Sequence, residues 1–406
     1  MNLPPWPATI GAAMLFLAFS EPALASEELT LASGRSGTST YAAGVGLSAL
    51  IKFELLPREK IDLQAIESTG AVNNAHLLQT GDAELAILPS VIGHTARLGI
   101  GSFAGHPPET GFRAIATLWR DALHLLVRKD DVATGTIDDL LNLKDRKVFL
   151  GEASSGMIDA NRLLLADLGL ETDHTNFELA TVADGDGLAA IKRGEVDALS
   201  TAARPPEAGL ADMFTDTPSD LRLLDVTEAQ MVKANGNHWL WTPYAIPAAT
   251  YPGQAEDVWT IALSNVLVVR ADVDPDVVYA ITRSIFENLS YLKRIDPLMA
   301  DLSLETALAG LAMPLHPGAL RFFDEAGLTS KPITNDSTAS PGETPARPED
   351  KTPGIVPERY PDADVAGEWP HGVGGPLLKT PSPDRVTPSK DLQDQPVPHW
   401  LQRATL

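Results

Sequence analysis

The sequence predicts an α/β fold made of two similar units that face a shared cleft. Short apolar runs alternate with amphipathic stretches between residues 26 and 328, a pattern typical of strands joined by helices. A loop of glycine and hydroxyl residues joins a strand to a helix twice, near Ser36 and near Ser155. In both units a helix ended by a glycine, Gly81 or Gly194, then precedes acidic residues and an apolar strand. These observations predict two lobes with glycine loops at comparable positions.

The first loop lies between an apolar run at residues 29–31 and a helix that begins near Thr40. Backbone N–H groups gather at such a helix N-terminus, where they stabilise an anion. No Gly-Lys-Ser/Thr follows, which excludes the phosphate loop of nucleoside triphosphatases. The glycines around Ser36 do not match the nucleophile elbow of α/β-hydrolases either. We therefore expect this loop to bind a small anion.

The second loop follows an apolar strand at residues 148–151 and precedes an amphipathic helix. Ligands of doubly wound parallel sheets bind outside the carboxyl ends of the strands. Parallel pairing would place both loops there, so we expect them to line one cleft. The same alternation predicts further strands at 61–66, 85–88, 112–118, 124–128 and 258–270, and helices at 72–79, 136–143, 275–292, 304–311 and 319–326.

The first 25 residues predict an export signal. The apolar run at residues 10–19 is too short to span a bilayer but fits a signal-peptide core, and Ala23 and Ala25 supply a small-x-small cleavage site. No Lys or Arg precedes Arg35, so a retained N-terminal anchor is the alternative. Export would place the mature chain in the periplasm.

Composition narrows the function classes. The net charge of −23 disfavours nucleic acid and anionic membrane surfaces as partners. The chain has no cysteine, which excludes disulfides and thiol catalysis. No pair among the nine histidines has the spacing of a helical metal site, so we expect no metal and no cofactor. His124, in an apolar strand, and His316, between prolines, are expected to be structural.

No motif marks an active site, so the chain is not expected to be an enzyme. A hydrolase that used Ser36 or Ser155 would need a histidine within hydrogen-bond reach of the hydroxyl. The carboxylates that follow Gly81 and Gly194 are expected to face solvent. Residues 329–406 are rich in proline and lack a sustained apolar period, which predicts a disordered tail. Tyr360, Trp369 and Trp400 could dock a partner there; the alternative is a passive tail.

Several segments together resemble the TAXI class of TRAP-transporter solute receptors, which are periplasmic substrate-binding proteins. They are LASGRSGTSTYAAG (31–44), ESTGAVNNAHLLQTGDAELAIL (67–88), LHLLVRKD (123–130), GEASSG (151–156), IPAATYPGQAEDVWTIAL (246–263) and PLHPGALRFFDEAG (314–327). The resemblance implies a type II periplasmic-binding-protein fold, with two lobes joined by hinge strands. It also implies that lobe closure captures a small acid, such as glutamate or 2-oxoglutarate, for delivery to the membrane subunits of a TRAP transporter.

The resemblance implies ligand contacts position by position. The matched loop residues are Ser36, Gly37 and Thr38 in the first loop, Ser68, Thr69 and Gly70 with Asn73 in the second, Ser90 in the third, and Ser154, Ser155 and Gly156 in the other lobe. Tyr251 lies in a Thr-Tyr-Pro-Gly-Gln motif near the region between the lobes. Pro89 and Val91 depart from the Gln-Ser-Asp pattern often seen around the third loop, which leaves the identity of the ligand open.

Two arginines are candidate carboxylate clamps. Arg35 stands where the family usually has a small residue, and Arg204 precedes Pro205-Pro206. Each could bind a carboxylate with two parallel hydrogen bonds if it turned inward, or could simply be solvated.

The predicted organisation is a signal peptide at 1–25, lobe 1 at 26–132 and 245–328, lobe 2 at 133–244, and a tail at 329–406. The predicted function of the protein is capture of a small organic acid or amino acid by lobe closure, followed by delivery to a TRAP-type secondary transporter. The alternative is a periplasmic sensor or interaction subunit that signals to a membrane partner.

Overall fold

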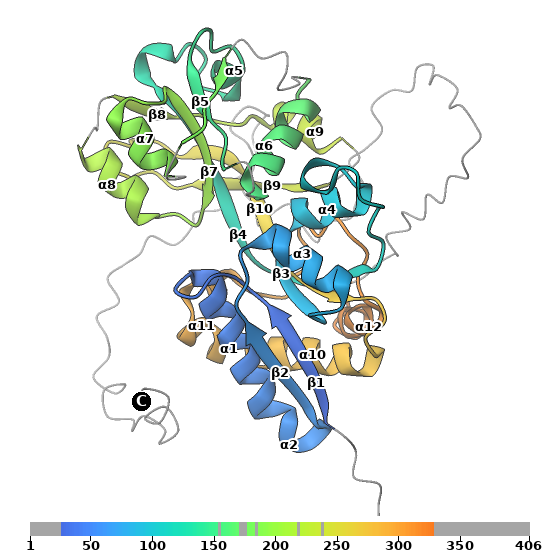
Figure 1. Ribbon diagram of the computed structural model, residues 1–406. Coiled ribbons are helices and arrows are strands. Elements are labelled where there is room, and N and C mark those ends of the chain that lie inside the picture. Colours follow the sequence, from blue (N-terminus) through green and yellow to red (C-terminus); the bar gives the residue numbers. More distant parts are fainter. Residues whose placement is uncertain are drawn as a thin grey trace, which may run out of the picture. The chain divides into compact units, whose positions relative to one another are not determined.

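The computed structural model describes residues 26–152, 156–169, 177–182, 186–216, 220–236 and 239–328 (Figure 1). The predicted export signal, the predicted tail at 329–406, and Ser154 and Ser155 of the second glycine loop lie outside the described residues. No helix within the described ranges combines the length and the apolar character that a membrane crossing requires.

The described strands form one ten-stranded sheet in the order β2-β1-β3-β10-β4-β7-β5-β6, with β8 beside β4 and β9 beside β10. The predicted α/β class is confirmed. The strands are β1 (Glu27–Ala32), β2 (Ile61–Ile66), β3 (Leu85–Pro89), β4 (Phe112–Arg128), β5 (Lys147–Phe149), β6 (Glu178–Leu179), β7 (Ala198–Ala203), β8 (Leu221–Leu223), β9 (Trp241–Ile246) and β10 (Val258–Arg270).

The repeat that the sequence predicts is present in the pairing of the strands. β1 lies between β2 and β3 and is parallel to both, and β5 lies in the same way between β6 and β7. The two long strands β4 and β10 join these triplets and pair antiparallel with each other and with the triplets. The sheet is therefore mixed rather than parallel throughout, which corrects the expectation of a doubly wound parallel sheet.

The helices connect the strands of each triplet and close the chain. They are α1 (Ser39–Glu54), α2 (Leu56–Glu59), α3 (Ala71–Thr80), α4 (Ser90–Leu98), α5 (Ile137–Leu141), α6 (Gly156–Asp167), α7 (Gly187–Arg193), α8 (Ala208–Asp216), α9 (Glu228–Asn235), α10 (Pro275–Glu287), α11 (Leu289–Ile295) and α12 (Pro317–Glu325), with 3-10 turns η1 (Gly101–Phe103), η2 (Lys129–Asp131) and η4 (Pro297–Asp301). Gly81 and Gly194 end α3 and α7 in the left-handed conformation, at φ 80° and 74°, as the sequence predicts.

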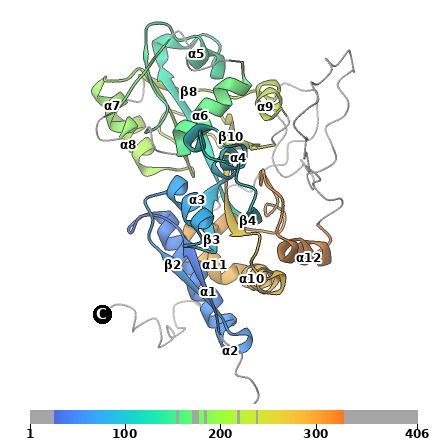
Figure 2. The same ribbon diagram turned by 45° about the vertical axis from the view of Figure 1, so that its right-hand side comes forward.

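Buried apolar side chains form two clusters. Each of the long strands β4 and β10 contributes one part of its length to one cluster and another part to the other. One cluster takes Ile115 and Trp119 from β4 and Leu267 from β10, together with side chains of α1, α10 and α12. The other takes Leu126 from β4 and Val258 from β10, together with side chains of α7 and α8. In Figures 1 and 2, accordingly, α10 and α11 lie with α1 at the β1–β2 end, and α7 and α8 lie at the other end of β4.

Three predicted elements differ from the structure. β4 is one strand of 17 residues rather than two strands, because Arg120 and Asp121, which lie between the two predicted strands, are paired in the ladder with β10. The predicted helix at 275–292 is divided at Asn288 into α10 and α11.

The third difference is the segment at 304–311, which forms turns instead of a helix. Its carbonyl groups point to the long strands, since the amide of Thr117 donates to the carbonyl of Ala307 at 2.8 Å. The hydroxyls of Thr117 and Ser264 both donate to the carbonyl of Ala309, at 2.7 and 2.8 Å. These bonds replace the hydrogen bonds that a helix would make along its own axis.

Candidate functional site

A cavity of about 300 Å³ lies where several strands of the sheet end. Ser33, Gly34 and Arg35 follow β1, Pro89 ends β3, and Glu152 follows β5, so the cavity touches the carboxyl ends of strands from both triplets. Four residues expected to contact a ligand line it, namely Arg35, Thr38, Thr69 and Gly70. The other lining residues are Ser33, Gly34, Thr40, Ala71, Ile87, Pro89, Glu152 and Asn265.

The first glycine loop is held by its own hydrogen bonds. The hydroxyl of Thr38 accepts from the amide of Tyr41 at 3.3 Å and donates to the carbonyl of Arg35 at 2.7 Å, so Thr38 caps α1. The amide of Ser36 donates to Oε1 of Glu67 at 3.1 Å. A carboxylate of the chain thus already takes one of the N–H groups that the sequence assigns to a ligand. Gly37 turns the loop at φ 85°, a conformation that favours glycine.

The second loop is organised in a similar way. The amide of Ser68 donates to the carbonyl of Gly34 at 3.0 Å, which ties the two loops together. The amide of Thr69 donates to Oδ1 of Asn73 at 3.1 Å, and the amide of Gly70 donates to the hydroxyl of Ser68 at 3.3 Å. Ser68 and Asn73 therefore shape the loop, while Thr69 and Gly70 line the cavity.

Arg35 supplies the positive charge of the cavity. Its side chain is exposed, and its guanidinium has no ion-pair partner within the described ranges. Such a guanidinium can bind a carboxylate with two parallel hydrogen bonds at no cost to another contact.

Glu152 and Asn265 also line the cavity, and the sequence did not predict them as ligand contacts. Glu152 is the second residue of the GEASSG motif and is exposed at the edge of the cavity. Asn265 interrupts the apolar run of β10 and is only 7% exposed. Its amide nitrogen donates to Oδ2 of Asp121 at 2.8 Å. A single amide inside an apolar strand is the signal that could have identified it, because a buried polar group needs a partner.

Ser90 and Gly156, two other expected contacts, do not line this cavity. Ser90 begins α4, is fully buried, and its hydroxyl has no hydrogen-bond partner within the described ranges. Gly156 begins α6, and a Cβ there would lie 3.0 Å from Cγ1 of Ile92. Glycine at this position lets α6 approach α4 closely, which is a packing role.

Arg204 and Tyr251 also lie away from the cavity lining. The guanidinium of Arg204 donates to the carbonyl of Pro297 and, at 3.2 Å, to Asp301 in η4. Tyr251 is 1% exposed and packs in the core cluster around α7 and α8. Its hydroxyl lies 2.8 Å from Nε2 of His124 and accepts from the amide of Glu207 at 3.1 Å. His124 is structural in this network, in agreement with its apolar strand context.

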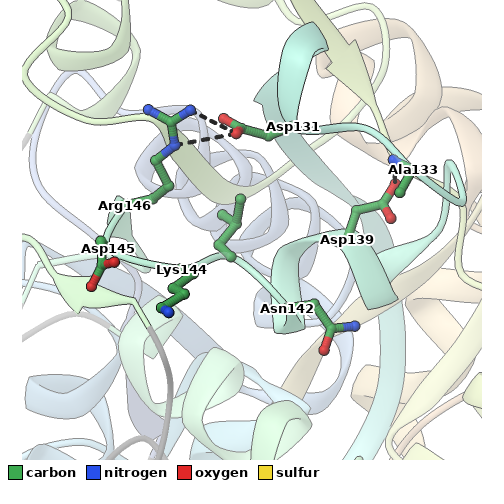
Figure 3. A pocket seen from close by; sticks show the side chains of 8 residues that line it. Asp131, Ala133, Asp139, Asn142, Lys144, Asp145 and Arg146 are labelled. Atoms are coloured by element: carbon green, nitrogen blue, oxygen red, sulfur yellow. Dashed lines mark hydrogen bonds and ion pairs between the residues drawn. The ribbon is translucent and has the colours of Figure 1, made fainter.

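A second cavity, of about 470 Å³, lies in the segment between β4 and β5 and is shown in Figure 3. One continuous stretch of chain lines it, from Asp131 to Arg146. Arg146 contacts Asp131 at 2.8 Å, and the carboxylate of Asp139 accepts from the amides of Ala133, Thr134 and Gly135. These hydrogen bonds lower the pKa of Asp139 despite the opposing effect of its burial. The charged groups Asp131, Asp139 and Arg146 thus stabilise the local chain, and the first cavity is the candidate ligand site.

The residues described contain no group of three or more His, Cys, Asp or Glu side chains arranged to hold a metal ion.

A structural comparison finds solved bacterial proteins that are similar to this chain. One is a TctC solute-binding protein from Polaromonas, with 17% identity, coverage of 69% of this chain and 90% of that chain, and a TM-score of 0.44. Another is the periplasmic aliphatic sulphonate binding protein SsuA from Escherichia coli, with 14% identity, coverage of 74% and 84%, and a TM-score of 0.35. A third is the GluR0 ligand-binding core from Nostoc punctiforme in complex with L-glutamate, with 12% identity, coverage of 66% and 98%, and a TM-score of 0.38.

The family comparison covers nearly all of the described chain. The model of the NMT1-like family matches residues 31–327, which begin in β1, include both strand triplets and end after α12. Every residue that lines the cavity lies within this match. The chain belongs to the NMT1-like family.

Proposed function

We propose that this protein is an exported solute receptor that captures a small organic acid in the cavity of about 300 Å³. The observation that carries the proposal is the position of Arg35, a cation without an ion-pair partner in the described chain, at a cavity reached by strand ends of both triplets. Binding sites of α/β sheets lie at this edge. The volume falls at the lower limit for small-molecule sites, which suits a ligand of a few carbon atoms.

The charge of the chain supports a local rather than a general attraction. The net charge of −23 repels an anion at long range, so a carboxylate has to be held by a cation within the site. Arg35 can provide this contact, and the hydroxyl residues Thr40 and Thr69 add polar lining. Glu152 also lines the cavity, so the lining includes a negative group as well.

We further propose that capture involves closure of two lobes, at 26–132 with 245–328 and at 133–244. The two core clusters support this division. The boundary between the clusters, however, lies within β4 and β10 rather than at the ends of these strands. Closure would rearrange polar contacts that link these two lobes outside the strand ladders. The amide of Ser102 donates to Asp159 of α6 at 3.1 Å, and Arg204 contacts Asp301 at 3.2 Å. Two strand crossings are compatible with hinge motion.

The transport step follows from the resemblance to TAXI receptors. We propose that the loaded receptor delivers its ligand in the periplasm to the membrane subunits of a TRAP-type transporter.

Titration of the purified full chain tests the proposal. Mono- and dicarboxylic acids of two to six carbons, with their hydroxy, amino and oxo derivatives, would be screened by thermal shift and measured by calorimetry. We expect saturable binding of at least one compound, with affinity reduced by Arg35→Met. A folded chain that binds none of them, or binding that does not depend on Arg35, would contradict the proposal.

A further inference from the structure

We propose that Asn265, held in one orientation by Asp121, is a specificity-determining residue of the cavity. It selects ligands that carry a hydrogen-bond donor, a hydroxyl or an ammonium group, beside the carboxylate, and it rejects the matching 2-oxo acids. This inference rests on the proposed function, since it concerns the ligand of the same cavity.

Asn265 is placed at the centre of the sheet. It pairs with Pro89 of β3 on one side and with Trp119 of β4 on the other, where the register between β10 and β4 shifts. Pro89 and Asn265 both line the cavity, and Asn265 is 7% exposed. The amide is therefore a nearly buried polar group whose surroundings are the strands and the cavity.

Asp121 fixes which end of the amide is available. The Nδ2 atom of Asn265 donates to Oδ2 of Asp121 at 2.8 Å. A carboxylate can only accept, so the amide cannot turn over without placing two acceptor oxygens against each other. Oδ1 of Asn265 remains an acceptor, and it has no hydrogen-bond partner in the described part of the chain.

The surroundings of Asp121 keep this arrangement in place. Burial raises the pKa of Asp121 above its ordinary value, and the hydrogen bonds from Asn265 and Trp119 and the positive charge of Arg204 limit this rise. A buried carboxylate that lost the Asn265 donor would keep its desolvation cost without compensation. Asp121 is thus a positioning residue, which acts on the ligand through Asn265.

An acceptor fixed at the cavity distinguishes ligands by their substituent. Arg35 and Asn265 line the same cavity of about 300 Å³, so a ligand of a few carbon atoms can present its carboxylate to Arg35 and a substituent to Asn265. A hydroxyl or ammonium at that carbon can donate to Oδ1, whereas a carbonyl oxygen meets it lone pair to lone pair. A site that has a buried partner for a donor discriminates strongly against an analogue without one.

Two matched sets of compounds test the inference. Each set differs only at the carbon beside the carboxylate: L-glutamate, 2-hydroxyglutarate, 2-oxoglutarate and glutarate, and L-alanine, L-lactate, pyruvate and propionate. Binding to the full chain and to its variants is measured by calorimetry. In the wild type, the tighter-binding set should show the hydroxy or amino acid bound at least about tenfold more tightly than the oxo acid.

Variants of Asn265 and Asp121 test whether these two residues cause the ratio between the affinities for the hydroxy or amino acid and for the oxo acid. Asn265→Leu removes the acceptor and should bring the ratio to within about threefold. Asp121→Asn retains the shape but can donate or accept, so Asn265 can turn over; the ratio should fall in the same way, mainly because the oxo acid binds better. Asn142→Leu is the matched control, because Asn142 is exposed in the second cavity, and it should leave the ratio unchanged.

The outcomes separate the two proposals. A ratio that persists in both folded variants, or a wild type that binds the oxo acid equally well, overturns the role of Asn265 and leaves solute capture intact. Failure of the wild type to bind any compound of either set, or of the wider panel above, overturns solute capture and this inference with it. If Asn265→Leu does not fold, the nearly isosteric Asp121→Asn variant decides the question.

Discussion

The hydroxyl of Tyr251 and Nε2 of His124 lie 2.8 Å apart inside the protein, where both side chains are almost fully buried. The Nδ1 atom of His124 lies 2.9 Å from the carbonyl of Ala122, which can only accept, so Nδ1 carries the proton. Nε2 then accepts from the tyrosine hydroxyl, whose oxygen accepts from the amide of Glu207. This chain of hydrogen bonds joins β4 to the segments on both sides of it and requires a neutral histidine.

The first prediction is an acid-dependent loss of stability caused by His124. Desolvation lowers its pKa from 6.5 to about 4. Below pH 6.5 the unfolded chain gains a proton that the folded chain refuses, so stability is complete above that pH and falls between about 6.5 and 4. The shift corresponds to a loss of up to about 3 kcal/mol.

Urea unfolding at pH 7.5 and at pH 4.5, for the wild type and His124→Gln, measures this effect. The variant should be less stable at pH 7.5 but should lose less on acidification, because the other titrating groups are common to both proteins. Equal losses in the two proteins would show that His124 does not cause the acid sensitivity.

The second prediction concerns Tyr251→Phe. The substitution leaves Nε2 of His124 and the amide of Glu207 without partners in a buried region, which should lower the free energy of unfolding by about 1–3 kcal/mol. Ligand affinity should not change, because Tyr251 does not line the cavity. Calorimetry on the folded variant at 10 °C provides the check, and a fall in affinity there would restore Tyr251 to the ligand contacts that the sequence implies.

The third prediction is that Arg35 contributes to ligand affinity but not to the stability of the fold. Arg35→Met should weaken carboxylate binding at least about tenfold, since a charged hydrogen-bond pair is lost. Stability should stay within about 0.5 kcal/mol, because the side chain is exposed and has no ion-pair partner in the described ranges. Arg58→Met is the matched control: Arg58 is also exposed, lies 3.8 Å from Glu54 and is outside the cavity lining. Equal affinities for the two variants would argue against a clamp.

The fourth prediction is that Glu67 competes with the ligand. Its carboxylate accepts from the amide of Ser36 at the start of the first loop, where an anionic ligand would also be stabilised. Glu67→Gln removes the negative charge and should strengthen carboxylate binding by a few-fold, as expected for one exposed charge at close range. The effect should decrease in high salt. Calorimetry at two salt concentrations measures it, and weaker binding in the variant would mean that Glu67 supports the loop instead.

Sequence patterns predicted the parts of the fold that depend on local chemistry. Gly81 and Gly194 both end helices in the left-handed conformation, and β2 occupies the predicted residues. The same patterns did not predict β4 as one strand. Charged residues in its middle are compatible with a buried ladder only because Asp121 meets Asn265 and Arg120 lies over the ring of Tyr244 at 5.6 Å, and these partners are distant in sequence.

The candidate site was predicted in part for the same reason. The glycine-rich loops and the family resemblance together suggested Arg35, Thr38, Thr69 and Gly70 as ligand contacts, and these four residues line the cavity. The sequence could not show that the first loops tie up their own N–H groups, because the acceptors are side chains such as Glu67 and Asn73 whose directions depend on the fold. Glu84 and Asp197 show this limit again: expected to face solvent, they accept from the backbone amides of Thr30 and Lys147.

The division of the core along β4 and β10 sets an order for folding as the chain emerges from the ribosome. The cluster around α7 and α8 needs only residues from Ala122 to Val258, whereas the other extends from Leu29 to Phe323. The N-terminal strands must therefore wait for the last helices, and an early nucleus has to form in the middle of the sequence. Pulse-labelled hydrogen exchange during refolding should protect β7 before β1; the reverse order would be inconsistent with this sequence of events.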